Sequence, residues 1–128
     1  MPGYVTEAER LGHALRIREP KLAAATVEEQ YRRQPDLAER YGPRGWRYCV
    51  RDAARHVDAL ASSIELGGPW RFVGYVRWAR GVLPAHRIPD RDLLASLQSL
   101  RDILPRLVPP QAADAAREHL DAALALWA

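Results

Sequence analysis

The residues best suited to chemistry gather in one short stretch around the single cysteine of the sequence. Cys49, Asp52 and His56 follow one another at steps of three and four residues. On a helix, with 100° per residue, their side chains lie within about 60° of each other. They offer a thiol, a carboxylate that accepts hydrogen bonds, and an imidazole. The spacing therefore predicts a polar strip along one flank of a helix.

Two interpretations of this strip stay open on spacing alone. It can border a pocket beside the apolar stripe of the same helix, or it can mark the solvent boundary, with Asp52 paired to Arg55 or His56. A reactive Cys49 thiolate needs a cationic setting, and the arginines two residues away point to other sides of the helix. A lone helical cysteine is more often a small core residue.

Other reactive groupings do not stand out in the sequence. The histidines at 13, 56, 86 and 119 include no pair at a metal-binding interval of three or four residues. Local context suggests no Ser-His-Asp or Cys-His grouping and no glycine-rich phosphate loop. We therefore expect no catalytic residues and no metal site. His13, His86 and His119 are expected at the surface, and haem ligation through His86 is a minor alternative.

Composition limits the class of protein. The 128 residues are 48% hydrophobic and 27% charged, which suits one globular domain over residues 1–128. No apolar run reaches the roughly 18–20 residues of a membrane span, and the first residues lack the blocks of a signal peptide. We expect a cytoplasmic protein without disulfides. The net charge is +3, but the arginines are scattered and usually have an acid nearby, so nucleic-acid binding is not expected.

Proline and glycine divide the chain into helical segments, and no stretch alternates apolar and polar residues as a strand does. Gly42 is expected to end a short helix in a left-handed conformation, and Asp90 or Asp92 is expected to cap a later one. Pro105 is expected to kink or end that helix. The expected helices cover residues 5–18, 20–34, 35–41, 44–66, 70–83, 90–104 and 110–127.

Two of these segments have distinctive apolar patterns. The helix over 44–66 should carry a single apolar stripe. The helix over 70–83 has apolar side chains around most of its circumference, so we expect it to be buried on several sides. The stripe consists of Trp46, Val50, Ala53, Val57, Leu60, Ala61 and Ile64.

The order of helix lengths indicates a fold. Two short helices precede a long central helix, an aromatic helix and a closing antiparallel pair, which matches the succession in a globin. A simple four-helix bundle needs more equal lengths. We therefore expect an all-α, globin-like single domain of about six to eight helices, with an irregular bundle as the alternative.

The segment Cys49-Val50-Arg51-Asp52 resembles the Cys-x-Arg-Asp motif of phycobiliproteins, whose fold is globin-like and whose cysteine carries a linear tetrapyrrole. The wider pattern resembles the photoglobins, non-haem globin domains of bacterial photosensors that are often joined to a cobalamin-binding domain. The matching stretch runs from Arg40-Tyr41-Gly42 to Trp78, about a third of the chain.

The resemblance implies a bilin cofactor such as biliverdin, bound with or without a covalent bond. It implies that Asp52 accepts hydrogen bonds from pyrrole N–H groups, that Arg51 or Arg55 pairs with a propionate, and that Cys49 is the candidate thioether site. It also implies a wall around the chromophore. The candidate wall residues are Tyr48, His56, Trp70, Phe72, Tyr75 and Trp78.

The function expected from this resemblance is a photosensory or ligand-sensing module that signals through helix packing or partner contacts. Its partner would be a second copy, or a cobalamin-binding or signalling protein. The resemblance does not extend to the N-terminal helices by which phycobiliproteins form discs, so an antenna is not expected. The alternatives are a non-haem, globin-like stress-sensing interaction domain without pigment and, less favoured, a haem-binding sensor.

Overall fold

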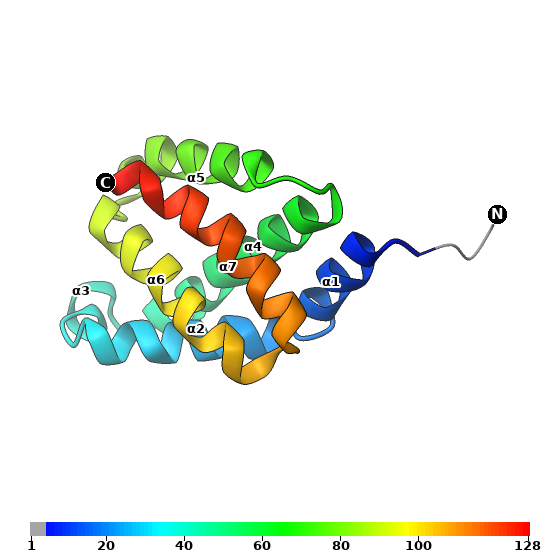
Figure 1. The fold of residues 1–128 in the computed structure, drawn as a ribbon. Helices are drawn as coiled ribbons and strands as arrows, with labels where there is room; N and C mark the ends of the chain where they lie inside the picture. Colours follow the sequence, from blue (N-terminus) through cyan, green and yellow to red (C-terminus); the bar gives the residue numbers. More distant parts are fainter. Residues whose placement is uncertain (1–4) are drawn as a thin grey trace.

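The computed structural model describes residues 5–128, and these residues form an all-α fold without strands (Figure 1). This confirms the expected all-α single domain of six to eight helices, while its globin-like character stays a prediction. Two short 3₁₀ segments, η1 (Leu83–His86) and η2 (Ala125–Trp127), follow α5 and α7. The helices are α1 (Glu7–Arg16), α2 (Glu19–Arg33), α3 (Leu37–Tyr41), α4 (Gly45–Glu65), α5 (Trp70–Val82), α6 (Asp90–Leu107) and α7 (Pro110–Leu124).

The helix boundaries follow from local chemistry. The Thr6 hydroxyl accepts a hydrogen bond from the Glu9 N–H at 3.0 Å and caps α1. Pro20 and Pro110 lie in the first turns of α2 and α7, where a missing N–H costs nothing. Gly42 and Gly67 have φ values of 71° and 87°, which only glycine adopts freely, and they end α3 and α4. Gly42 thus has the expected positive φ, although its ψ of −170° is extended rather than helical.

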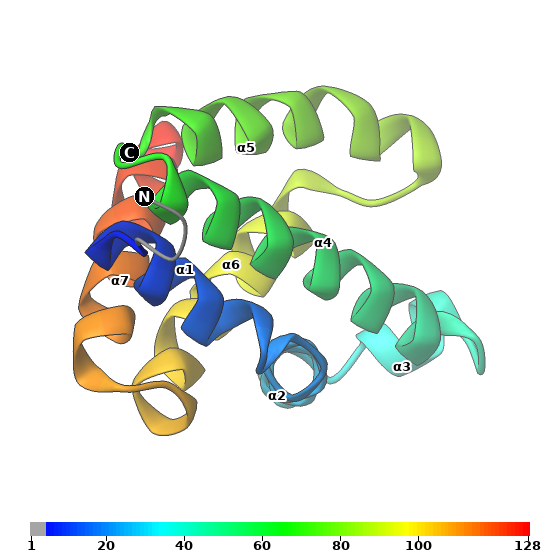
Figure 2. The ribbon, with the colours of Figure 1, turned by 90° about the vertical axis from the view of Figure 1, so that its right-hand side faces the viewer.

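The long helix α4 is the centre of the arrangement. It packs against α1, α2, α3, α5 and α7. The two views show α5 and α2 at opposite edges of the molecule, with α4 between them (Figures 1 and 2). The core lies where α4, α6 and α7 meet these outer helices. Its largest fully buried side chains are Phe72, Leu15, Leu22, Leu37, Leu60, Leu97, Leu100, Leu104 and Leu120.

The expectation that α5 is buried on several sides is wrong. Trp70 and Trp78 are 78% and 61% exposed, whereas Phe72 and Val76 are buried. The helix lies at an edge of the molecule (Figure 2) and packs mainly against α4, α7 and η1. The side of α5 that carries Trp70 and Trp78 therefore faces outward whatever its composition. Trp46, expected in the stripe of α4, is likewise 42% exposed at the start of that helix.

Two smaller expectations also fail for identifiable reasons, and a third fails in one of its two alternatives. His119 is buried rather than at the surface, because its Nδ1 lies 2.7 Å from the Ser63 hydroxyl. Neither Asp90 nor Asp92 caps α6, because both carboxylates bind side chains from other helices. Pro105 lies inside α6 and does not end it, because the helix continues to Leu107; a kink at this proline stays a prediction. Over residues 5–128 the structure contains no helix with the length and apolar character that crossing a membrane requires.

Candidate functional site

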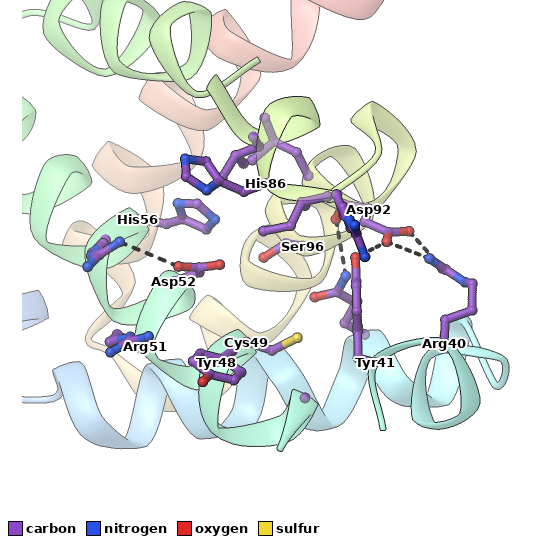
Figure 3. Close-up of a pocket in the computed structure, with 17 residues that line it drawn as sticks. Arg40, Tyr41, Tyr48, Cys49, Arg51, Asp52, His56, His86, Asp92 and Ser96 are labelled. Carbon is purple, nitrogen blue, oxygen red and sulfur yellow. Dashed lines mark hydrogen bonds and ion pairs between the residues drawn. The ribbon is translucent and has the colours of Figure 1, made fainter. Parts of the chain in front are cut away.

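A cavity of about 760 Å³ opens between the first half of α4, the start of α6 and the segment that joins α5 to α6 (Figure 3). Its volume lies in the range of about 300–1,000 Å³ that is usual for small-molecule sites. Because α6 packs mainly on α2 and α7, this part of α4 faces the cavity instead of another helix. The polar flank of α4 thus has space in front of it.

Six of the ten predicted binding residues line this cavity. The three residues of the polar strip, Cys49, Asp52 and His56, all line it, as the pocket interpretation expects, while Asp52 also pairs with Arg55, as the solvent-boundary interpretation expects. They lie together because steps of three and four residues keep them on one flank of α4. The other three are Tyr48, Arg51 and Arg55.

The four predicted residues of α5 are not on the cavity wall. Phe72 is buried in the core, and Trp70 and Trp78 project from the outer face of α5, contrary to the expected aromatic wall. Tyr75 contacts the site indirectly, because its hydroxyl lies 2.6 Å from Nδ1 of His56. The expectation placed the whole of α5 beside the ligand, whereas only the η1 segment after it reaches the cavity.

Asp52 is the carboxylate with the weakest protein contacts at this site. Its side chain is 28% exposed, and its nearest ionic partner is Arg55, with Nη1 3.7 Å from Oδ1. No hydrogen bond joins the carboxylate to another side chain or backbone N–H of residues 5–128. Burial raises the pKa of Asp52, against the opposing charges of Arg55, Arg51 and His86. A half-buried carboxylate that lacks hydrogen-bond donors from the protein is stabilised when a bound ligand supplies such donors.

His56 lies on the cavity wall as a neutral ring. It is 4% exposed, and burial, with a smaller contribution from Arg55, lowers the pKa of His56 to about 4. When Tyr75 donates its hydroxyl proton to Nδ1, the neutral imidazole carries its own proton on Nε2. The Tyr75 ring also meets the imidazole edge to face, with centroids 5.7 Å apart. Tyr75 thereby fixes the orientation of a side chain that faces the cavity.

The thiol of Cys49 is half-buried on the same wall. Burial raises the pKa of this thiol, so at neutral pH it is protonated and weakly nucleophilic. The hydroxyl of Tyr31, behind it, is buried and has no hydrogen-bond partner in the described part of the chain. Burial raises the pKa of Tyr31 to about 12. The surroundings of Cys49 thus do not activate its thiol as a nucleophile.

A hydrogen-bonded cluster on Asp92 closes one end of the cavity (Figure 3). This carboxylate is 2% exposed and accepts hydrogen bonds from Arg40 at 2.9 and 3.0 Å, from Gln34 at 2.9 Å and from the Tyr41 hydroxyl. Burial raises the pKa of Asp92, but these bonds outweigh it and hold the pKa below its ordinary value. The cluster fastens α3 and the end of α2 to the start of α6.

The mouth of the cavity is cationic. Arg51, Arg55, His86 and Arg87 are exposed and line it, and the Arg51 guanidinium lies 5.1 Å from the centre of the Tyr48 ring. The exposure of His86 confirms the predicted surface histidine, but its position at the mouth was not predicted. These groups would attract carboxylates on a ligand.

Eleven residues that line the cavity could not be assigned to it from the sequence, and all of them except Gly45 lie outside α4. The Arg40-Tyr41-Gly42 segment was noted only as part of a resemblance, and the Pro84–Pro89 connection only as a bracket between helices. Charged residues inside a proline-bounded connection, such as His86 and Arg87, were the available signal. The missed residues are Gln30, Arg40, Tyr41, Gly45, Leu83, His86, Arg87, Ile88, Asp92, Leu93 and Ser96.

Comparison with known proteins does not identify this site. A scan against models of known protein families gives no match for the chain, and a search of curated proteins gives none.

Proposed function

We propose that the cavity binds a linear tetrapyrrole such as biliverdin and that the protein is a globin-like photosensory or ligand-sensing module. The observation that carries this proposal is Asp52, a half-buried carboxylate on the cavity wall without a hydrogen-bond donor from residues 5–128. A bilin carries several N–H groups close together, and such donors would satisfy both carboxylate oxygens at once. A protonated bilin would also offset the charge of Asp52.

The remaining lining fits the other parts of such a molecule. Leu83, Ile88 and Leu93 supply apolar contacts, and Tyr48 supplies an aromatic one. The cationic mouth suits two propionate groups, for which Arg51 and Arg55 are the expected partners. Cys49 lies on the wall at which a thioether would form, and attachment with or without that bond is compatible with the proposal.

The contact between His56 and Tyr75 offers a route from the cavity to the protein surface. A bilin supplies absorption of red light and a change of shape on isomerisation. A ligand that displaces the His56 ring would change the 2.6 Å contact with Tyr75, which lies on α5. Signalling would then proceed through the packing of α5 against α4 and reach a partner protein or a second copy.

The test is to produce the protein together with biliverdin and record its absorbance. We expect red absorbance with a structured far-red band, which Asp52→Ala shifts to the blue or abolishes. The matched control is Asp58→Ala, an exposed aspartate on the same helix that pairs with Arg16, and this variant should keep the wild-type band. The absence of red absorbance in the wild type, or an unchanged band in Asp52→Ala, would contradict the proposal.

Two further measurements separate the alternatives. A Soret band after production with haem would favour the haem sensor instead. Pigment that survives denaturation in wild type but is released in Cys49→Ala is held through that sulfur. If neither bilin nor haem binds, the interaction domain without pigment becomes the better proposal.

A further inference from the structure

The outer face of α5 consists of side chains that no other element covers. Trp70 and Trp78, eight residues apart, are among the most exposed large apolar side chains described. On a helix with 100° per residue, Trp70, Gly74 and Trp78 fall within about 80°, and Arg71 and Arg77 lie at the two margins of an arc of about 120°. We call this surface the α5 face. It consists of Trp70, Arg71, Gly74, Arg77, Trp78 and Gly81, all of which are exposed.

The two glycines of the α5 face have no explanation within the described chain. Apart from the adjacent residues and the backbone of α5 itself, a Cβ atom at Gly74 or Gly81 would find no atom within 4 Å. By contrast, a Cβ atom at Gly12 in α1 would approach Cγ of Glu65 to 2.3 Å, so packing between helices requires that glycine. Glycine inside a helix is destabilising relative to alanine. At Gly74, this cost leaves a gap between two exposed tryptophans.

The α5 face is also cationic and unpaired. No acidic residue occurs in α5, and neither Arg71 nor Arg77 forms an ion pair with any side chain of residues 5–128. Arg80, which points elsewhere, is paired with Asp90 at 2.9 Å. A complementary surface would therefore present an apolar side chain to the gap at Gly74 and carboxylates to the two arginines.

We propose that the α5 face binds an acidic amphipathic helix of another protein. An apolar side chain of that helix would enter the gap at Gly74, between Trp70 and Trp78, and acidic side chains on its flanks would pair with Arg71 and Arg77. Helices approach closely where one of them carries glycine, and exposed tryptophan and arginine are typical anchors of interfaces. This proposal does not depend on what the cavity binds.

The other occupants fit the α5 face less well. A second copy packed across Gly74 would add two more arginines to an interface to which α5 contributes no carboxylate, and the gathered like charges disfavour that dimer. A lipid surface would suit the tryptophans and arginines, but it gains nothing from a gap that is one side chain wide. The glycines and the charges together favour a helix of opposite charge.

The first experiment selects a displayed library of helical peptides, randomised on one face, for binding to the whole chain. We expect the selected peptides to gain Asp and Glu on both sides of an apolar position. The double variant Arg71→Glu/Arg77→Glu should weaken the binding of the synthesised peptides at least tenfold. The control Arg10→Glu, at an exposed arginine of α1, should change it less than twofold. Selected peptides without an acidic excess, or with equal affinity for the double variant, would overturn the proposal.

The second experiment substitutes Gly74→Ala. Alanine is the better helix former, so this variant should melt at a higher temperature than the wild type. Its methyl group fills the gap, so the variant should bind the selected peptides at least tenfold more weakly. Stabilisation with unchanged peptide binding would show that the gap receives no side chain and would overturn the proposal.

Two controls detect the other occupants. If sedimentation equilibrium shows that the wild type is a dimer and that Gly74→Ala is a monomer, the occupant of the α5 face would be a second copy and not the proposed helix. Co-sedimentation with phosphatidylcholine and phosphatidylserine vesicles, abolished by Trp70→Ala/Trp78→Ala, would instead assign the face to a lipid surface if no acidic peptide is selected. A monomer that stays in solution with such vesicles and binds acidic peptides supports the proposal.

Discussion

Two aspartates of one cavity illustrate how burial alone does not decide the state of a carboxylate. Asp92 is the more deeply buried, yet its pKa is lowered, because Arg40, Tyr41 and Gln34 all donate hydrogen bonds to it. Asp52 is less buried, yet its pKa is raised, because no donor within residues 5–128 compensates its loss of water. The carboxylate of Asp92 therefore already has its hydrogen-bond donors within the protein, whereas the carboxylate of Asp52 can accept hydrogen bonds from a ligand.

His56 makes the stability of the protein depend on pH in a definite window. The folded state keeps the ring neutral until about pH 4, whereas the ordinary pKa of a histidine in the unfolded chain is 6.5. Acidification between these values protonates only the unfolded state, so the free energy of unfolding should fall by up to about 1.4 kcal/mol per pH unit. Above pH 6.5 this histidine contributes no pH dependence. Urea unfolding at intervals between pH 7 and pH 4 measures the slope.

The variants His56→Gln and Tyr75→Phe show whether the burial of the His56 ring or its hydrogen bond to Tyr75 causes this slope. His56→Gln should remove the contribution of this ring, while the buried His119, whose pKa burial also lowers, leaves a slope of the same sign. Tyr75→Phe should keep the contribution of His56, because burial rather than the hydrogen bond is the main reason for the lowered pKa. Asp52 acts in the opposite sense, since its raised pKa lets the folded state take up a proton first, and comparison of variant with wild type largely cancels this contribution. An equal slope in wild type and His56→Gln would show that the ring is not buried as described.

At the scale of elements, one hydroxyl group joins three helices. The Ser63 Oγ of α4 donates to the carbonyl oxygen of Gly68 at 2.9 Å and accepts from the N–H of Phe72 at 3.2 Å. It also lies 2.7 Å from Nδ1 of His119 in α7, which can donate as a neutral ring. Every polar group in this buried contact is thereby satisfied, and the tight turn between α4 and α5 is fixed.

Ser63→Ala should destabilise the protein by about 2 kcal/mol, because it leaves two buried polar groups, the Phe72 N–H and the His119 ring, and the half-buried Gly68 carbonyl without this partner. Urea unfolding measures the loss, and the amide of Phe72 should exchange with solvent faster than its neighbours in α5. The matched control is Ser62→Ala, next in sequence, whose half-buried hydroxyl accepts one bond from Arg16. That control should cost less than about 1 kcal/mol. Equal losses in both variants would mean that the contact contributes no more than an ordinary side-chain bond.

The elements themselves could be predicted from sequence, because proline and glycine mark their ends and apolar spacing marks their faces. The expected helix over 44–66 and the observed Gly45–Glu65 differ by one residue at each end. The polar strip from Cys49 to His56 was found for the same reason, since one helix fixes the relative positions of its own residues. Both predictions rest on interactions between near neighbours.

The parts that could not be predicted depend on contacts between distant segments. Asp92 meets Arg40 across 52 residues of sequence, and no local pattern encodes that pairing. The wrong expectation that Trp70 and Trp78 line the cavity has a related cause. The composition of a helix shows that the helix is apolar, but it does not show which side of the helix lacks a neighbouring element. The cavity wall contributed by η1 and α6 was missed for this reason.

At the scale of the whole molecule, the cavity is tied to the last turn of the chain. Arg80, at the end of α5, donates to Asp90, at the start of α6, at 2.9 and 3.1 Å and to the carbonyl oxygen of Leu126 at 3.0 Å. Its guanidinium lies 4.3 Å from the centre of the Trp127 ring, and the indole N–H donates to Asp90 at 2.7 Å. The segment between Arg80 and Asp90 contains η1, which forms one wall of the cavity. The contacts of Leu126 and Trp127 with Arg80 and Asp90 thus hold together the two ends of the segment that contains η1. We call this set of contacts the clamp.

Trp127→Ala should open this clamp and loosen the cavity wall more than the rest of the molecule. It removes a cation–π contact and a charge-assisted hydrogen bond, so we expect a loss of about 2 kcal/mol in the free energy of unfolding. Hydrogen exchange should accelerate at residues 83–88 while the amides of α1 and α2 change much less, because those helices pack on the far side of α4. Trp127→Phe keeps a ring beneath Arg80 and loses only the N–H bond, so its effect should be about half as large. Uniform acceleration over all helices would mean that Trp127 supports the fold as a whole, and unchanged exchange at residues 83–88 would mean that the clamp does not hold the wall.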